Sequence, residues 1–175
     1  EHLSAAGYNA CKYVIPAGEA SKCADNLLAF LNFMAGEQLT RSDAVIAFGG
    51  GVVGDLGGLS ASLYLRGVKY VQVPTTLLAA VDSSVGGKTA IDIPAGKNLV
   101  GSFYQPSLVC CDTALMETLP KDIYRDGCAE VIKYGMILDG ELYNTLHTLP
   151  FDREAVVTRC VEIKRDVVQQ DEFDN

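Results

Sequence analysis

Short apolar runs and longer amphipathic stretches alternate along residues 1–115. The short runs have the length of strands and are bounded by turn residues; they lie at 11–15, 43–48, 70–74 and 108–112. Continuous apolar runs of this kind are typical of strands in a parallel sheet that is covered on both faces. We therefore expect four strands here, with the run at 43–48 forming a buried one.

Helical patterns separate these runs. Apolar residues recur at helical spacing between residues 27 and 34, which predicts a helix from about Ser21 to Ala35 with Gly36 as its C-cap. A second helix is expected after the glycine-rich segment Gly49–Asp55, reaching about Tyr64. This alternation of strands and helices predicts an α/β fold: a Rossmann-like parallel sheet with helices on both faces.

The pattern changes after about Leu115. Three helical patterns follow at about 121–138, 140–147 and 152–170, without an intervening strand pattern. We therefore place a domain boundary near Thr113–Pro120. Residues 1–115 are expected to form the α/β domain, and residues 116–175 the beginning of an all-helical domain.

Composition narrows the possible functions. The chain has 175 residues, 49% of them apolar and 21% charged, which fits one domain and part of a second. Its net charge of −8 argues against a nucleic-acid partner, because phosphate backbones require a basic face. A membrane span and a signal peptide are not expected. Six scattered cysteines without a CxxC pair predict buried, reduced thiols in a cytosolic protein, rather than a zinc-thiolate site.

Gly49, Gly51 and Gly54 match the spacing G-x-G-x-x-G between a predicted strand and a predicted helix. In that context the N–H groups at the helix start can bind a pyrophosphate, so a dinucleotide is expected; a tight turn with close packing is the alternative. The ribose-binding acid expected at the end of the next strand is missing, and Asp55 lies inside the turn instead. The segment Pro16–Lys22 could hold the ribose, although it also fits an ordinary helix start capped by Ser21.

The segment from Asp82 to Asn98 is rich in glycine, hydroxyl groups and lysine. It nearly matches a P-loop, but Asp82 occupies the first glycine position, where a carboxylate would repel phosphates. The preceding residues 76–81 also look helical, which excludes the strand that a P-loop follows. We therefore reject a nucleotide triphosphatase. Asp82 and Lys88 are expected in one glycine-rich loop, and Lys97–Asn98 in a second, around a ligand that carries hydroxyls and a phosphate.

Glu130 and Lys133 are three residues apart and share one face of a predicted helix. This arrangement fits half of a metal site or, by itself, an ordinary surface ion pair. Zinc usually requires three protein ligands, and His2 and His147 are the only histidines in the chain. His147 is expected to be a surface residue.

In this order the motifs resemble the 3-dehydroquinate synthase family. The resemblance covers nearly the whole chain, and it rests on the segments Pro16–Lys22, Gly49–Asp55, Pro74–Thr76, Val81–Thr89, Gly96–Asn98, Ala129–Gly135, Lys164–Val168 and Asp171–Glu172. It implies a cytoplasmic, homodimeric lyase of the shikimate pathway of aromatic amino-acid biosynthesis, dependent on NAD and on zinc or cobalt. Such enzymes convert 3-deoxy-arabino-heptulosonate 7-phosphate into 3-dehydroquinate and phosphate. NAD transiently oxidises one substrate hydroxyl and is regenerated in each turnover.

The resemblance also assigns roles by position. It implies that Glu19 and Lys22 hold the adenosine ribose, that Gly51–Asp55 cradles the pyrophosphate, and that Arg66 reaches a neighbouring subunit's site. The full set implied for NAD is Ala17, Gly18, Glu19, Lys22, Gly50, Gly51, Val52, Val53, Gly54, Asp55, Thr75, Thr76, Lys88, Lys97, Leu115, Met116, Glu117 and Thr118. The set implied for catalysis and substrate binding is Asp82, Lys88, Asn98, Lys133, Lys164 and Arg66. Glu130 is implied as a metal ligand.

The chain also departs from the family. Members have two further zinc histidines downstream of Asp171–Glu172 and an additional β-α unit at the start, and the sequence contains neither. We therefore expect a fragment that lacks the first β-α unit and most of the helical zinc- and substrate-binding domain. Alone, it should neither bind zinc tightly nor turn over substrate. The alternatives are a related sugar-phosphate cyclase, an NAD-dependent polyol or glycerol-phosphate dehydrogenase, and a non-catalytic nucleotide-binding or assembly module.

Overall fold

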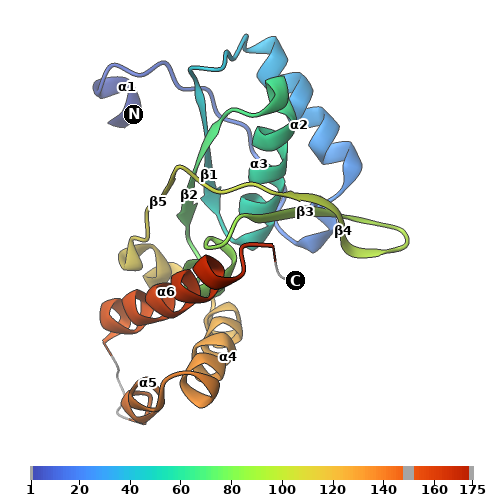
Figure 1. The fold of residues 1–175 in the computed structure, drawn as a ribbon. Helices are drawn as coiled ribbons and strands as arrows, with labels where there is room; N and C mark the ends of the chain where they lie inside the picture. Colours follow the sequence, from blue (N-terminus) through green and yellow to red (C-terminus); the bar gives the residue numbers. More distant parts are fainter. Residues whose placement is uncertain (1, 148–151, 174–175) are drawn as a thin grey trace.

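The computed structural model describes residues 2–147 and 152–173 and is drawn in Figure 1. Its main elements are α1 (His2–Ala5), α2 (Ala24–Gly36), β1 (Ala44–Gly49), α3 (Gly51–Leu63), β2 (Lys69–Pro74), β3 (Lys88–Ile93), β4 (Gly96–Phe103), β5 (Leu108–Val109), α4 (Lys121–Ile137), α5 (Gly140–Thr145) and α6 (Arg153–Gln170). Three short 3-10 helices complete the order: η1 (Glu19–Ser21), η2 (Tyr64–Arg66) and η4 (Thr113–Thr118). A π-helix, η3 (Ala79–Ser83), precedes β3.

The parallel sheet confirms the α/β prediction. Its strands are ordered β1-β2-β5, and β1 pairs with β2 in register from Ala44 opposite Lys69 to Gly49 opposite Pro74. Helix α3 connects β1 to β2 and packs against both strands. Val45 and Ala47 of β1 are buried in this arrangement. The apolar runs at 43–48 and 70–74 are thus strands, and the run at 108–112 contributes only the two residues of β5.

The expectation of helices on both faces of the sheet is wrong for the described residues. Ile46 and Phe48 point away from α3 in the alternation of β1 and are 46% and 60% exposed, and Leu108 of β5 is 58% exposed. Strand β1 is therefore half-buried rather than fully buried, because helix α3 covers one face only. The prediction of six buried, reduced thiols is confirmed only in part. All six cysteines are free thiols, but Cys11 and Cys110 are exposed.

The predicted strand at 11–15 does not form, because side-chain contacts with α2 hold this segment away from the sheet. The ring centroid of Tyr13 lies 5.0 Å from the ring centroids of both Phe30 and Phe33 of α2. Ile15 packs against the core cluster of Leu27, Leu56, Leu59 and Ile91. Helix α2 itself begins at Ala24, three residues later than expected.

The end of α2 also differs from the predicted glycine cap. Gly36 is the last helical residue, and the left-handed conformation falls two residues later, on Gln38 with φ of 58°. The amide of Leu39 then returns to the carbonyl of Met34. The chain thus leaves the helix through a later turn than the one that Gly36 suggested.

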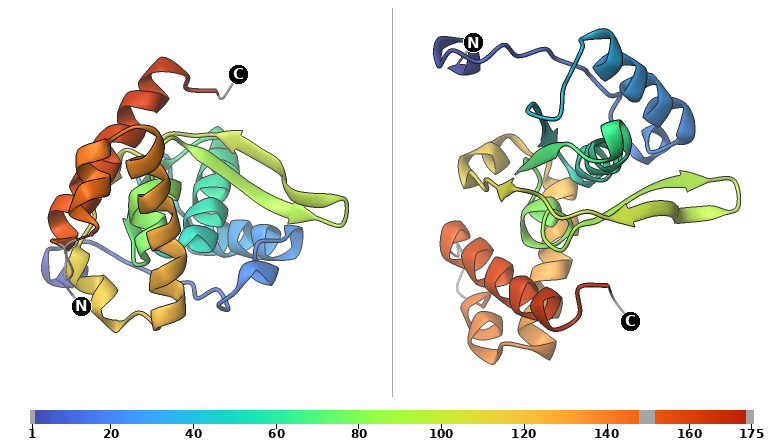
Figure 2. Two further views of the ribbon diagram at one scale, coloured as in Figure 1. Left: turned by 90° about the horizontal axis from the view of Figure 1, so that it is seen from below. Right: turned by 45° about the horizontal axis from the view of Figure 1, so that its top comes forward.

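The expectation that Asp82 and Lys88 share one glycine-rich loop and that Lys97–Asn98 lie in a second is wrong. Asp82 lies in the π-helix, Lys88 begins β3, and β3 and β4 form an antiparallel hairpin. Lys88 pairs with Phe103 and Ile91 with Val100, so Lys97 and Asn98 lie on a strand. At Gly101 a Cβ would come within 2.1 Å of the carbonyl oxygen of Thr89, so only glycine fits this close crossing. The hairpin extends away from the parallel sheet, as both views of Figure 2 show.

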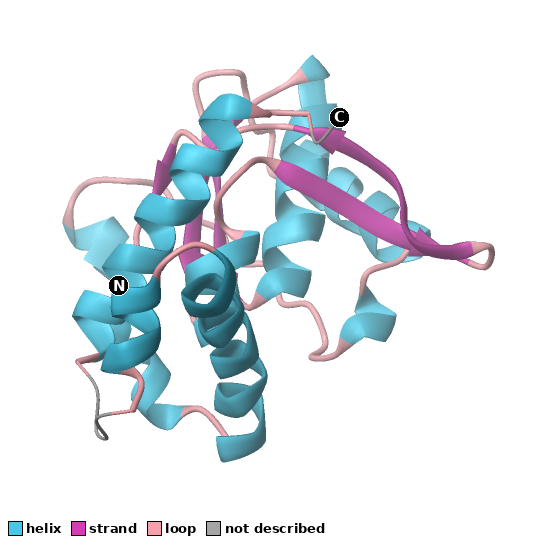
Figure 3. Ribbon diagram, turned by 60° about the horizontal axis from the view of Figure 1, so that its bottom comes forward, coloured by secondary structure: helices cyan, strands magenta, loops and turns pink. Residues whose placement is uncertain are grey.

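The three predicted helices of the second part are confirmed as α4, α5 and α6, and they gather on one side of the strands (Figure 3). They pack around the segment that includes the π-helix, in a core formed by Leu77, Ala80, Val81, Met116, Val131, Tyr134, Leu142, Val156, Val157, Cys160 and Ile163. Residues 77–81 therefore share a core with α4–α6. The domain boundary near Thr113–Pro120 stays a prediction. Across the described ranges, none of the helices combines the length and apolarity that a membrane crossing requires.

Gly127 sets the distance between α4 and the segment leading into the π-helix. A Cβ at this position would lie 2.6 Å from Cβ of Leu77 and 2.7 Å from the amide nitrogen of Leu78. We expect Gly127→Ala to lower the free energy of unfolding by about 2 kcal/mol, because the two backbones must separate. Gly140→Ala is the matched control, because nothing lies within 4 Å of its added Cβ. Thermal unfolding of the full-length protein compares them, and equal midpoints would contradict this packing.

Candidate functional site

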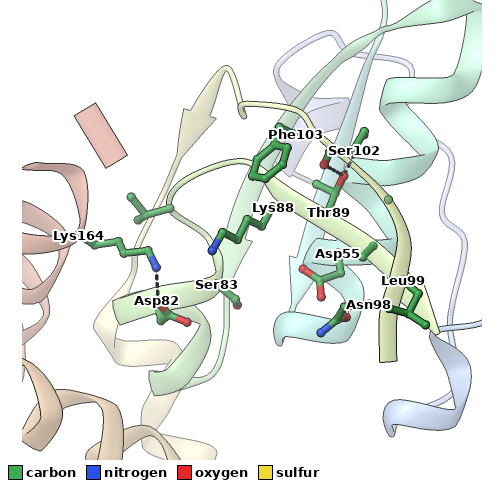
Figure 4. Close-up of a pocket in the computed structure, with 13 residues that line it drawn as sticks. Asp55, Asp82, Ser83, Lys88, Thr89, Asn98, Leu99, Ser102, Phe103 and Lys164 are labelled. Atoms are coloured by element: carbon green, nitrogen blue, oxygen red, sulfur yellow. Dashed lines mark hydrogen bonds and ion pairs between the residues drawn. The ribbon is translucent and has the colours of Figure 1, made fainter. Parts of the chain in front are cut away.

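A cavity of about 440 Å³ lies between the β3–β4 hairpin, the π-helix and α6 (Figure 4). Five of the predicted site residues meet here from five different elements: Asp55, Asp82, Lys88, Asn98 and Lys164. The lining is completed by residues that were not among the predicted site residues: Ser83, Val85, Thr89, Ala90, Leu99, Gly101, Ser102 and Phe103. Two ammonium groups, two carboxylates and several neutral hydrogen-bonding groups thus share one space, a combination suited to an anionic ligand with hydroxyls.

Asp82 is held by hydrogen bonds from two helices. It lies in the π-helix, a form that often occurs at functional sites. Its Oδ1 accepts hydrogen bonds from Lys164 Nζ at 2.7 Å and from the hydroxyl of Tyr134 at 3.1 Å. Burial, followed by the charges of Asp82 and Glu130, raises the pKa of Tyr134 well above its usual range. The phenol therefore remains a donor throughout the ordinary pH range.

Lys164 reaches the cavity because α6 passes close to the turn before β3. At Gly86, where φ is 108°, an added Cβ would lie 2.9 Å from Val168 Cγ2 and 3.8 Å from Lys164 Cε. Glycine is required here for both its conformation and its size. The turn and α6 can thus approach closely enough for the Lys164 ammonium to pair with Asp82.

The hairpin contributes Lys88 and Asn98 to the cavity, and Figure 4 shows both side chains, with Lys88 extending toward Lys164 and Asn98 lying near Asp55. Asn98 has φ of 57° near an irregularity in strand pairing, and its N–H donates to Asp92 Oδ1 at 2.8 Å. The N–H of Asp92 in turn donates to the carbonyl of Lys22 at 2.8 Å. Asp92 therefore orients Asn98, a role whose only sequence signal is a carboxylate between two isoleucines.

The glycine-rich turn lies at the carboxyl ends of β1 and β2, where open α/β sheets bind ligands. A Cβ at Gly50 would lie 3.1 Å from Thr76 Cγ2, and one at Gly51 would lie 3.2 Å from Ser83 Oγ. The N–H of Thr75 donates to the carbonyl of Gly49 at 2.9 Å. The turn thus meets the Thr75–Thr76 segment, with Val52 and Val53 in the first turn of α3. The first N–H groups of a helix generally have no intrahelical acceptor and are suited to an anion. In α3 the N–H of Val53 already donates to the carbonyl of Gly50 at 3.1 Å, so Gly51 and Val52 are the residues whose N–H groups would serve a ligand.

Lys22 connects the Pro16–Lys22 segment to the glycine turn. Its side chain is 5% exposed, and its ammonium lies 2.9 Å from Asp55 Oδ2 and 3.5 Å from Glu19 Oε1. Burial raises the pKa of Asp55, and Lys22 offsets part of that rise. Burial alone would lower the pKa of Lys22, but the hydrogen bond and charge of Asp55, with Glu19 and Asp92, raise it overall. Lys97 approaches Glu19 at 3.6 Å, and Ala17 and Gly18 are exposed nearby in sequence.

The other predicted site residues do not line this cavity. Arg66 is exposed on a turn where Leu65, Arg66 and Gly67 all have positive φ. In the Leu115–Thr118 segment of η4, the side chain of Met116 belongs to the core, whereas Glu117 and Thr118 are exposed. These assignments stay predictions.

Glu130 and Lys133 form the i,i+3 ion pair that their spacing allowed, with side chains 18% and 49% exposed. His147 is exposed, as expected, and its ring stacks edge-on against Tyr143. Among residues 2–147 and 152–173, no group of three or more histidine, cysteine or acidic residues could hold a metal ion. Glu130 is therefore at most one ligand of a site that these residues do not complete.

Comparison with known proteins gives matches along nearly the whole chain. A family model described as 3-dehydroquinate synthase N-terminal matches residues 12–126, and one described as 3-dehydroquinate synthase C-terminal matches residues 127–175. The 3-dehydroquinate synthase of Clostridium acetobutylicum is 49% identical over 97% of this chain and 49% of its own length. The chain spans about half the length of the curated relatives it matches.

Two solved structures share the fold closely. The 2-epi-5-epi-valiolone synthase of Streptomyces hygroscopicus, with NAD⁺ and Zn²⁺ bound, has a TM-score of 0.87 and 31% identity, over 93% of this chain and 48% of that one. A 2-deoxy-scyllo-inosose synthase complexed with carbaglucose-6-phosphate, NAD⁺ and Co²⁺ has a TM-score of 0.81 and 28% identity, over 91% of this chain and 46% of that one.

Proposed function

The chain belongs to the 3-dehydroquinate synthase family, and we propose from this premise that the whole protein converts 3-deoxy-arabino-heptulosonate 7-phosphate into 3-dehydroquinate and phosphate. The observation that carries the proposal is the cavity where Asp82, Lys88 and Lys164 meet beside the glycine turn. This reaction serves the shikimate pathway of aromatic amino-acid biosynthesis. The protein would be a lyase acting on a carbon–oxygen bond to phosphate.

NAD is the proposed cofactor, and the residues present fit it. The glycine turn brings the start of α3 to the carboxyl ends of β1 and β2, where a pyrophosphate could bind, and Lys22 and Glu19 lie where a ribose could follow. Bound NAD would supply reversible hydride acceptance, which lets the enzyme oxidise and later restore one substrate hydroxyl. Thr75, Thr76, Lys97 and the Leu115–Thr118 segment complete the proposed contacts.

The cavity residues would bind the sugar-acid phosphate. We assign its anionic groups to the ammonium groups of Lys88 and Lys164, and its hydroxyls to Asp82 and Asn98. The ion pair of Lys164 with Asp82 supports this, because it keeps a cation and an acceptor at fixed positions before substrate binds. Lys133 is proposed as a further substrate contact, and Arg66 as a contact from the neighbouring subunit of a cytoplasmic homodimer.

A zinc or cobalt ion is a weaker fit to this chain. Zinc in catalytic sites usually has three protein ligands, and the described residues offer Glu130 alone, already paired with Lys133. We therefore derive no step through a metal, and propose only that Glu130 supplies one carboxylate to a site completed by other parts of the whole protein. The 175-residue chain alone is expected to release no phosphate.

Phosphate release by the full-length protein tests the proposed function. With NAD and zinc, 3-deoxy-arabino-heptulosonate 7-phosphate should be turned over while NADH does not accumulate. Sedoheptulose 7-phosphate should be a poor substrate, because it lacks the carboxylate that the cavity lysines would bind. A preference for the sedoheptulose would favour another sugar-phosphate cyclase, and steady accumulation of NADH would favour a dehydrogenase. Either result would overturn the proposal.

A further inference from the structure

We propose that Tyr134 is a positioning residue: its hydroxyl holds the Asp82 carboxylate, and the backbone that carries it, in the orientation that receives substrate. This inference rests on the proposed function, which places Asp82 against the substrate. The two side chains are 52 residues apart in sequence, and they join α4 to the π-helix. Tyr134 itself does not line the cavity, so it acts through Asp82.

The hydroxyl of Tyr134 reaches two acceptors of the π-helix. It lies 3.1 Å from Asp82 Oδ1 and 3.3 Å from the carbonyl oxygen of Val81. The residue is 3% exposed, so water competes little for this proton. The phenol has one proton, which these two acceptors share. The contact thus ties the Asp82 side chain to the adjacent backbone and restricts the rotamer of Asp82.

The π-helix gives this contact its importance. π-helices are rare and occur mostly as single turns. Here the N–H of Ser84 donates to the carbonyl of Ala79 at 3.0 Å, which closes the five-residue turn. This turn leaves the carbonyl of Val81 facing α4, where Tyr134 supplies the donor. Without it, a buried acceptor next to Asp82 would lose its partner, a change that favours rearrangement of the turn.

The division of contacts on Asp82 supports the same role. Tyr134 and Lys164 both donate to Oδ1, from α4 and α6 respectively. The second carboxylate oxygen can therefore accept from a ligand without displacing either donor. Two donors from two helices hold one oxygen more firmly than Lys164 could alone, because a lysine side chain has many rotamers and this phenol is packed in the core.

Tyr134→Phe in the full-length protein tests the inference, because it removes the hydroxyl and keeps the packed ring. We expect kcat for phosphate release to fall about tenfold, while NAD affinity by calorimetry stays within about twofold. Tyr70→Phe is the matched control. Tyr70 is fully buried, its hydroxyl donates to the carbonyl of Tyr104 at 2.9 Å, and neither residue lines the cavity. Its loss should leave kcat unchanged.

Wild-type kcat in Tyr134→Phe would overturn the inference, and so would an equal fall in both variants. A crystal structure of Tyr134→Phe gives a readout that does not depend on turnover. The Asp82 carboxylate is expected to leave its present position or to occupy several rotamers. An unmoved, singly ordered Asp82 would overturn the positioning role even if the wild-type protein proved to catalyse another reaction, whereas failure of wild-type phosphate release alone would count against the proposed function.

Discussion

Asp82→Asn in the full-length protein is expected to lower kcat/KM for phosphate release by about a thousandfold. The substitution keeps the size of the side chain but removes its charge. Lys164, whose side chain is 20% exposed, then loses the counter-ion that holds its ammonium in the cavity. The substrate loses both a charged acceptor for its hydroxyls and a fixed cation for its anionic groups, so binding and orientation fail together.

Phosphate release and NAD calorimetry, measured on the same variant, check this result. NAD affinity should change by less than about threefold, because the glycine turn and the Lys22–Asp55 pair are untouched. Asp166→Asn is the control: Asp166 also forms an ion pair, with Arg165, but both side chains are more than half exposed. The control should retain wild-type activity. If kcat/KM for phosphate release falls less than tenfold in Asp82→Asn, this carboxylate does not contact the substrate.

Lys22→Met is expected to destabilise the full-length protein by about 3 kcal/mol at neutral pH, because it leaves the Asp55 carboxylate without its partner in a partly buried place. Methionine keeps most of the aliphatic length of lysine, so the fall in unfolding free energy measures the effect of removing the charge. Lys97→Met is the control, since Lys97 is 72% exposed and meets Glu19 only at 3.6 Å. Lys97→Met should lower the free energy of unfolding by less than about 0.5 kcal/mol. Denaturant unfolding measures both variants.

The difference in unfolding free energy between wild type and Lys22→Met should change with pH in a definite direction. Lys22 has a pKa above its ordinary value of 10.5 in the folded protein, so its stabilisation is complete below 10.5 and is lost as pH rises through the raised value. The Asp55 carboxyl, whose pKa burial raises above 3.8, favours the folded state below 3.8 and loses that contribution as pH rises through its folded pKa. The gap between wild type and Lys22→Met should therefore persist at neutral pH and narrow in strong alkali. A gap that widened there would contradict the pairing.

The β1–α3–β2 unit could be predicted because its signals are local. An apolar run, a glycine turn and a helical stretch follow one another within residues 43–74. The segment at 11–15 has the same strand-like composition, yet contacts of Tyr13 and Ile15 with α2 and the core prevail over it. The hairpin was missed for a different reason. Thr89, Ile91 and Ile93 alternate as in a strand, but the surrounding glycines and lysines are equally typical of ligand-binding loops.

Some residues of the candidate site could likewise be predicted from the sequence, and others could not. Asp82, Lys88, Asn98 and Lys164 carried a signal in charged groups and motifs, and the structure gathers them in one cavity. The contribution of Tyr134 depends on a tertiary contact between distant elements, and Asp92 acts through an irregular strand pairing. The contact of Tyr134 leaves no local pattern, and the only local signal of Asp92 is a carboxylate between two isoleucines.

We propose that the cavity between the hairpin, the π-helix and α6 holds the sugar-acid phosphate beside NAD on the glycine turn. A crystal structure of the full-length protein with NAD and an unreactive phosphonate analogue of the heptulosonate phosphate would show where both ligands bind. The analogue should contact Asp82, Lys88 and Lys164, with the NAD pyrophosphate at Gly50–Gly51. An analogue bound elsewhere, with these three side chains still contacting only protein and water, would contradict the account.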